Sequence, residues 1–126
     1  MIEALFNQPD YIAAKRLLGA TQLQQAAIAA NLGNIETPNY KRVQVSSGFA
    51  DQLREAVRSG DGSQIASVSP QLEEDPNAVS SRLDGNNVVL EKEMLQMMQT
   101  SVEHSMETQL VSGNLLRLRL AITGHS

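Results

Sequence analysis

Residues 90–122 form the longest uninterrupted stretch of helix-forming sequence in the chain, with no proline and a single glycine, Gly113. Apolar or small residues recur along it at alternating spacings of four and three, which is the heptad pattern of a coiled-coil seam. This first stripe consists of Leu90, Met94, Met97, Ser101, His104, Thr108, Val111, Leu115, Leu118 and Ile122. A second stripe beside it consists of Leu95, Met98, Val102, Met106, Leu110, Leu116 and Leu120. Because a helix that is apolar on two sides needs more than one neighbour, the pattern favours either assembly with other chains or one helix of an intramolecular bundle.

The same spacing appears near the start of the chain, in Tyr11, Ala14, Leu18, Thr21, Gln25, Ile28, Leu32 and Ile35. It predicts a helix over residues 11–32, with Asp10 able to cap the first amides. In both stripes the middle positions are polar and the ends are apolar. If the helices run antiparallel, the polar middles face each other and the apolar ends match. We therefore predict that the two terminal helices pair as an antiparallel coiled coil.

The segment between these helices, residues 43–87, predicts only short elements. Ser47 is placed to cap a short helix over 48–58, with Phe49, Leu53 and Val57 on one face. Residues 65–68 and 79–83 predict short strands, and the acidic run 70–77, with a proline near each end, predicts a loop. We expect a mainly α-helical fold in one structural unit. It comprises an N-terminal helix and bend over 1–42, an irregular middle segment over 43–87 and a long C-terminal helix over 88–126.

Composition narrows the functional classes. The net charge of −4 argues against the basic face that nucleic-acid binding requires, so we predict no nucleic-acid partner. The chain has no cysteine, which excludes disulfides, thiol nucleophiles and cysteine metal sites. No stretch approaches the roughly 20 apolar residues of a membrane span. The first seven residues lack the basic start and apolar stretch of a Sec signal peptide, so a protein working outside the cytoplasm would need another export route.

Candidate catalytic and metal-binding residues are few. His104 occupies a seam position, where a packed histidine is the commoner role, and no H-E-x-x-H pattern of a zinc protease surrounds it. The run 84–87 has the residue types of a calcium loop, but Leu95 stands where a bidentate glutamate is required. Four carboxylates at helical spacing predict a solvated face: Glu91, Glu93, Glu103 and Glu107. We predict no enzyme activity and no cofactor, metal or small-molecule substrate.

A dense group of helix breakers follows the N-terminal helix. Asn34, or the glycine before it, can take the left-handed conformation that ends a helix. Pro38 stops helix continuation, and Pro38-Asn39 suits the two central positions of a β-turn. The side chains of Asn31, Asn34 and Thr37 can bond the backbone groups that such a bend leaves free.

Residues 29–41 run Ala-Ala-Asn-Leu-Gly-Asn-Ile-Glu-Thr-Pro-Asn-Tyr-Lys. The string resembles the signature A-x-N-I-A-N-x-x-T-P-G-Y-K/R of bacterial flagellar rod and hook proteins. Leu32, Gly33 and Asn39 depart from that pattern, which has Ile, Ala and Gly there. Asn39 keeps access to positive φ, so the turn is retained, whereas Gly33 weakens the last helical turn.

Residues 82–94 run Arg-Leu-Asp-Gly-Asn-Asn-Val-Val-Leu-Glu-Lys-Glu-Met. This second string resembles the R-x-D-G-N-N-V-x-L-x-x-E-M run of the small proximal rod proteins of the same family, in which a long terminal helix also follows. The chain is similar in size to those proteins and shorter than the distal rod and hook proteins, which carry inserted domains. The resemblance covers roughly residues 11–42 and 82–122.

The resemblance implies a structural role in the flagellar basal body. Proximal rod subunits self-assemble in the periplasmic rod, contact other rod proteins, and join the membrane ring and export gate to the rest of the torque-transmitting rod. They pass through the flagellar type III export gate without cleavage, which agrees with the missing signal-peptide pattern. The second proximal rod protein is an alternative inside the family. A soluble helical-bundle adaptor and, more remotely, an enzyme are alternatives outside it.

Two sets of residues carry these expectations. The family signature comprises Asn31, Asn34, Thr37, Pro38, Tyr40, Lys41, Asp84, Gly85, Asn86, Asn87 and Val88. We expect it to fix how the middle segment leaves the helical pair. The helix-packing and assembly residues comprise Leu18, Ile28, Leu32, Leu90, Met94, Met97, Val111, Leu115, Leu118, Ile122, Leu95, Val102, Met106 and Leu110. We expect inner stripes to join the helices, outer stripes to bury against neighbouring subunits, and the terminal segments to fold on assembly.

Overall fold

A computed structural model describes residues 9–80 and 82–123, and for residues 114–123 it describes the course of the backbone alone. The expected lead-in over residues 1–7 lies outside the described residues. In chain order the elements are α2 (Pro9–Gly33), β1 (Val43–Val45), α3 (Gly48–Ser59), α4 (Gly62–Ser67), β2 (Leu72–Glu74) and α5 (Leu90–Thr123). The prediction of a mainly helical chain is confirmed.

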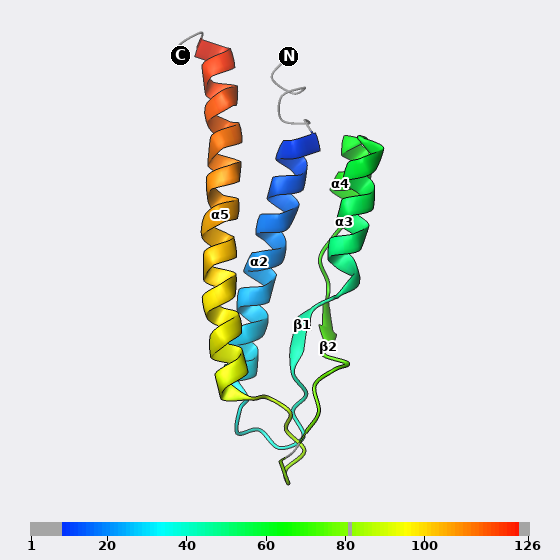
Figure 1. Cartoon of the computed structure of the whole chain (residues 1–126), viewed down its shortest axis with the longest axis vertical. Helices are drawn as coiled ribbons and strands as arrows, with labels where there is room; N and C mark the ends of the chain where they lie inside the picture. The colour runs from blue at the N-terminus through cyan, green and yellow to red at the C-terminus, as the bar shows by residue number, and fades with distance from the viewer. Residues whose placement is uncertain (1–8, 81, 124–126) are drawn as a thin grey trace.

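The helix α2 stands in the middle of the molecule (Figure 1). It packs against α5 on one side and against α3 and α4 on the other. The two long helices run in opposite directions, since α2 descends toward the bend from which α5 later rises (Figure 1). Interlocking of their side chains as a coiled coil stays a prediction.

The apolar core lies between α2, α3 and α4. Four buried residues form it, namely Phe49, Leu53, Ala56 and Ile65, and Ile12, Ala13, Leu17 and Ala20 of α2 pack against them. The predicted short helix is present as α3 and ends at Gly60, which adopts the left-handed conformation with φ of 70°. Val57, expected on the buried face, is exposed, because Ala56 completes the i, i+4, i+7 stripe that starts at Phe49.

The predicted strand over residues 65–68 is wrong, because residues 62–67 form α4. Asp61 caps this helix, its carboxylate accepting a hydrogen bond from the Ser63 amide at 2.9 Å. Ile65 points into the core and is fully buried. A single apolar side chain inserted from one helical turn gives no periodicity from which to distinguish helix from strand.

The middle segment instead contains a two-stranded antiparallel ribbon, in which Val43 pairs with Glu74 and Val45 with Leu72. The strand β2 falls inside the predicted loop over 70–77. The second predicted strand, over 79–83, is absent at the residues that the structure describes there. Strands of three residues are too short to show alternation, so the sequence pattern missed the ribbon.

Candidate functional site

The two family-like strings, far apart in the sequence, fold against each other at the end of the molecule where α2 finishes and α5 begins. We call residues 31–42 and 82–93 together the junction. The Asn39 amide donates to the Asp84 carbonyl at 2.8 Å, and the Asn87 amide donates to the Tyr40 carbonyl at 3.4 Å. The Asn87 side chain accepts from the Arg42 amide at 2.6 Å and donates to the Ala78 carbonyl at 3.3 Å. Backbone and side-chain bonds therefore tie the bend to the segment before α5.

Asn86 is the centre of one half of the junction. Its side-chain amide donates to three carbonyls of the bend, those of Asn34 at 2.9 Å, Ile35 at 3.1 Å and Thr37 at 2.9 Å. Its side-chain oxygen accepts from the Val88 amide at 2.8 Å. All three carbonyls lie in the bend beyond Gly33, the last residue of α2, so one buried side chain fixes the course of the chain after the helix.

Asn31 is the centre of the other half. Its side chain makes two bonds with the backbone of Val43, to the carbonyl and from the amide, each at 2.9 Å. Its oxygen also accepts from the Tyr40 hydroxyl at 3.0 Å, and its amide donates to the Glu93 carboxylate at 3.2 Å. The last turn of α2 is thereby joined to β1 and to the first turn of α5.

The turn at Pro38 and Asn39 is tight, with the Tyr40 amide donating to the Thr37 carbonyl at 3.3 Å. Asn39 adopts a φ of 62° and Gly85 a φ of 80°, and the two turns touch. A Cβ atom added to Gly85 would lie 2.5 Å from the Asn39 side-chain oxygen. A side chain at position 85 therefore has neither the backbone conformation nor the space that it needs.

The remaining signature residues lie around these two centres. Thr37 donates to the Asn34 side chain at 3.0 Å, and Asn34 donates to the Ala30 carbonyl at 2.8 Å. Lys41 donates to the Gly85 carbonyl at 2.6 Å. Val88 is buried, whereas Pro38 is exposed. The structure thus brings the signature residues together. Arg82, the first residue of the second string, joins them by donating to the Ile35 carbonyl at 2.6 Å.

Glu93, expected on a solvated face, is fully buried. Its carboxylate accepts from the Arg42 guanidinium and from Asn31. Arg42 also pairs with Asp75 at 2.9 Å, just beyond the end of β2. Burial raises the pKa of Tyr40, and the neighbouring Glu93 carboxylate raises it further. One hint of this cluster is present in the sequence, since Glu93 belongs to the second string and Arg42 directly follows the first.

The face that α5 turns to α2 is polar. Buried Glu93 and Thr100 and half-buried Glu107 follow one another at spacings of seven residues, and the Thr21 hydroxyl of α2 donates to the Glu107 carboxylate. Desolvation raises the pKa of Glu107, against the opposing effect of the bond from Thr21. Glu107, like Glu93, therefore lies away from the solvated face predicted for it.

The apolar stripes of α5 point elsewhere. The first stripe was expected to face α2, but Leu90, Met94 and Met97 are all exposed, because the bonds of Glu93 and Glu107 hold the polar stripe inward. In the second stripe Leu95, Met98, Val102, Met106 and Leu110 are exposed as well. Among the other described residues of the first stripe, His104 and Val111 are half-buried, whereas Ser101 and Thr108 are exposed. The side chains of Leu115, Leu118 and Ile122 lie outside the described residues.

On α2 the predicted packing positions are more shielded. Ile28 is buried, and Leu18 and Leu32 are half-buried. The contrast with α5 leaves one long apolar surface on the described part of the chain. We call the exposed residues Met94, Leu95, Met97, Met98, Val102, Met106 and Leu110 the outer face of α5.

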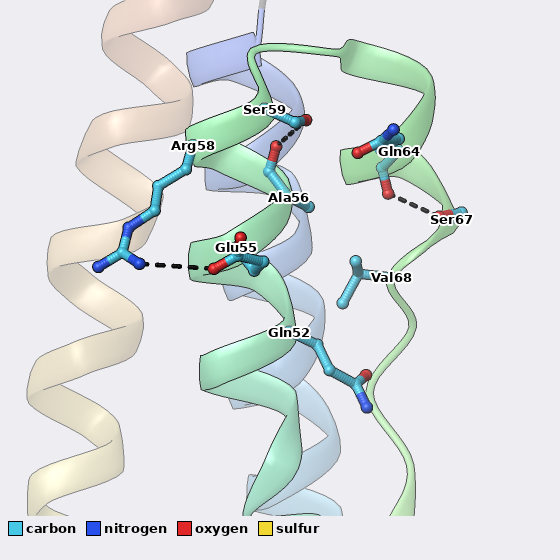
Figure 2. A pocket seen from close by; sticks show the side chains of 8 residues that line it. All are labelled: Gln52, Glu55, Ala56, Arg58, Ser59, Gln64, Ser67 and Val68. Carbon is cyan, nitrogen blue, oxygen red and sulfur yellow. Dashed lines mark hydrogen bonds and ion pairs between the residues drawn. The ribbon is translucent and has the colours of Figure 1, made fainter.

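A shallow open depression between α3 and α4 is lined by Gln52, Glu55, Ala56, Arg58, Ser59, Gln64, Ser67 and Val68 (Figure 2). Its polar side chains bond locally, with Arg58 paired to Glu55 at 3.4 Å. The hydroxyls of Ser59 and Ser67 donate to the backbone carbonyls of Ala56 and Gln64 (Figure 2). They are therefore not paired with a general base, as a catalytic serine would be.

Within residues 9–80 and 82–123, the acidic and histidine side chains form no cluster of three that could hold a metal ion. No helix among these residues combines the length and the apolar character that crossing a membrane requires.

Comparison with known proteins bears on the two strings. The chain is 26% identical to the flagellar basal body rod protein FlgB of Borrelia hermsii, over 86% of this chain and 92% of that protein. It is 27% identical to the flagellar basal body rod protein FlgB of Bacillus subtilis, over 85% of this chain and 88% of that protein. The chain is similar to FlgB. No family model matches it. The resemblance expected from the strings at 29–41 and 82–94 is thus confirmed by two proteins that match the chain along most of the chain's length.

Proposed function

We propose that this chain is a structural subunit of the flagellar rod that assembles through its terminal helices. The observation that carries the proposal is the orientation of α5, which buries a polar stripe and exposes an apolar one. An exposed row of large apolar side chains along a helix is a common mark of a protein–protein interface. Both FlgB relatives are named as rod proteins of the flagellar basal body, and a rod is a structure in which such an interface would be used.

The energetics of the outer face suit assembly. Burying one Leu, Met or Val side chain stabilises a complex by roughly 1.5–3 kcal/mol, so a few such contacts per neighbour offset the entropic cost of association. A filament requires contacts that do not close into a ring, each subunit presenting one surface to the next. In this arrangement the antiparallel α2–α5 pair acts as a strut, and the outer face meets the neighbouring copies.

We further propose that the subunit belongs to the proximal rod, in the periplasmic part of the basal body. Its partners there would be copies of itself, other rod proteins, and components of the membrane ring and export gate. It would reach this place through the flagellar export gate without a cleaved signal peptide. The junction residues would fix how the β1–β2 ribbon and α3 leave the helical strut. The bond between Asn86 and Asn34 and the bond from Asn31 to Val43 of β1 support that role.

A charge on the outer face tests the proposal. Val102→Glu should abolish growth of polymers, because an ionised carboxylate cannot be buried against a neighbour without a partner. Ala50→Glu, an equally drastic change at an exposed position of α3, is the control and should leave polymerisation intact. Sedimentation across a concentration series distinguishes the outcomes, since open polymers keep growing and closed oligomers reach a plateau. A wild-type chain that remains a monomer or a closed dimer at every concentration would favour a soluble adaptor instead.

Deletion of the gene in its own organism gives the test in the cell. Basal bodies imaged by electron microscopy should then lack any rod beyond the membrane ring. A complete rod with normal motility would contradict the proposal, and a rod that begins but stops short would indicate the second proximal rod protein.

A further inference from the structure

The buried carboxylate of Glu93 is placed to set the rotation of α5 about its own axis. It lies in the first turn of the helix and is bonded to two other parts of the chain, to Asn31 at the end of α2 and to Arg42 before β1. Arg42 is itself held by Asp75 on the far side of the ribbon. We infer that Glu93 is a positioning residue, which decides which face α5 turns to α2 and which face it presents outward.

Helix geometry connects the two faces. At about 100° per residue, Val102 lies about half a turn around the axis from Glu93. Leu95, Met98 and Met106 lie within about 40° of Val102, and Thr100 and Glu107 lie close to Glu93. The exposed fraction is 60% for Val102 and 2% for Thr100, only two residues away. The bonds that point Glu93 inward therefore point this part of the outer face outward.

Hydrophobic burial alone favours the opposite orientation. If α5 turned by half a revolution, the apolar side chains near Val102 would be buried against α2, and Thr100 and Glu107 would be released to water. Glu93 opposes that rotation, because its carboxylate would have to leave Arg42 and Asn31. The inference rests on the proposed function for its purpose, since a rod subunit needs its outer face free to meet a neighbour.

Cysteine labelling measures the orientation directly, because the natural chain has no cysteine. Single Thr100→Cys and Val102→Cys variants report the inner and the outer face in turn. With Glu93 present, a maleimide should label position 102 faster than position 100 by on the order of tenfold, because the buried thiol reacts only through local opening. Glu93→Leu should reverse that order, while Arg42 keeps Asp75 as a partner.

A matched control and a second variant make the result specific. Glu103→Leu makes the same change at an exposed position of the same helix and should leave the labelling order as it was. Glu93→Gln keeps the shape of the side chain but loses its charge, and should lower the ratio severalfold without reversing it. Circular dichroism checks that each variant keeps its helices. An unchanged ratio in either Glu93 variant, or fast labelling at both positions in both variants, would overturn the inference.

The labelling experiment uses the free subunit at low concentration, so it does not depend on assembly. Polymerisation of the wild-type chain, measured separately by sedimentation, tests the proposed function. If the labelling order reverses while the wild-type chain never polymerises, the rotation is right and the proposed function is wrong. If the wild-type chain polymerises and the labelling order does not change, the proposed function is supported and the role of Glu93 in setting the rotation is wrong.

Discussion

The two sides of α2 are held by different chemistry. Toward α3 and α4 the contact is apolar, through Phe49, Leu53, Ala56 and Ile65. Toward α5 side-chain hydrogen bonds join the two helices, from the Asn31–Glu93 bond at one end to the Thr21–Glu107 bond further along. Apolar contacts are non-directional, whereas hydrogen-bonded and ionic contacts act only at one register and one rotation. The apolar contacts with α3 and α4 therefore stabilise the packing without selecting one rotation, whereas the polar contacts of α5 select one.

The largest effect should come from breaking the polar side at Arg42. Arg42→Met leaves the buried Glu93 carboxylate with Asn31 as its remaining side-chain donor, and removing one partner of a buried pair costs about 3–5 kcal/mol. Urea denaturation measures the loss. Arg54→Met breaks the exposed pair with Asp51 and serves as the control, with an expected cost below about 1 kcal/mol. Equal losses of unfolding free energy in the two variants would show that the buried pair of Arg42 and Glu93 contributes no more to stability than an exposed pair.

A somewhat smaller effect is expected from the apolar side. Ile65→Ala removes a fully buried side chain from the core, and such truncations cost roughly 2–5 kcal/mol through lost burial and the cavity left behind. Val57→Ala, on the exposed face of α3, should cost far less in the same denaturation experiment. If the two variants unfolded at the same urea concentration, α4 would not be part of a cooperative core.

The smallest effect concerns the pH dependence of the contact between Glu107 and Thr21. The folded-state pKa of Glu107 is raised by desolvation, so the folded chain holds its proton more tightly than the unfolded chain does. The free energy of unfolding should therefore increase as the pH falls from the folded-state pKa of Glu107 to its unfolded-state pKa. Above both pKa values the cost of keeping Glu107 ionised in the folded chain should be fully present. Glu107→Gln should flatten this part of the pH profile, which thermal unfolding at a series of pH values would reveal. A profile that Glu107→Gln leaves unchanged would assign the pH dependence to other groups.

The long elements could be predicted from the sequence because their signals are local. The helices predicted at 11–32 and 90–122 are observed as Pro9–Gly33 and Leu90–Thr123, and the turn at Pro38-Asn39 is present. Proline, asparagine and glycine impose their turn preferences on the nearest residues, so the sequence near these boundaries is enough to predict them.

The orientation of α5 could not be predicted in this way. Heptad spacing assigns apolar residues to the inner face, because burial usually decides packing. Here the orientation of α5 depends on the ion pair between Glu93 and Arg42, which lie 51 residues apart in the chain, and on the ion pair between Arg42 and Asp75. A carboxylate at helical spacing looks the same in the sequence whether it is solvated or paired, so only the folded chain distinguishes the two. The strands β1 and β2 were missed for a simpler reason, their length of three residues each.

The junction joins α2 and α5 at one end only, and this gives the pair a mechanical direction. Force applied along both helices in opposite senses loads all the bonds between them at once. Force that draws apart the start of α2 and the end of α5 acts first on the contacts farthest from the junction, so the contacts between the helices break one after another. A helical pair built in this way resists sliding better than peeling, so in the proposed rod the lateral neighbours would have to carry any load that pulls the helices apart.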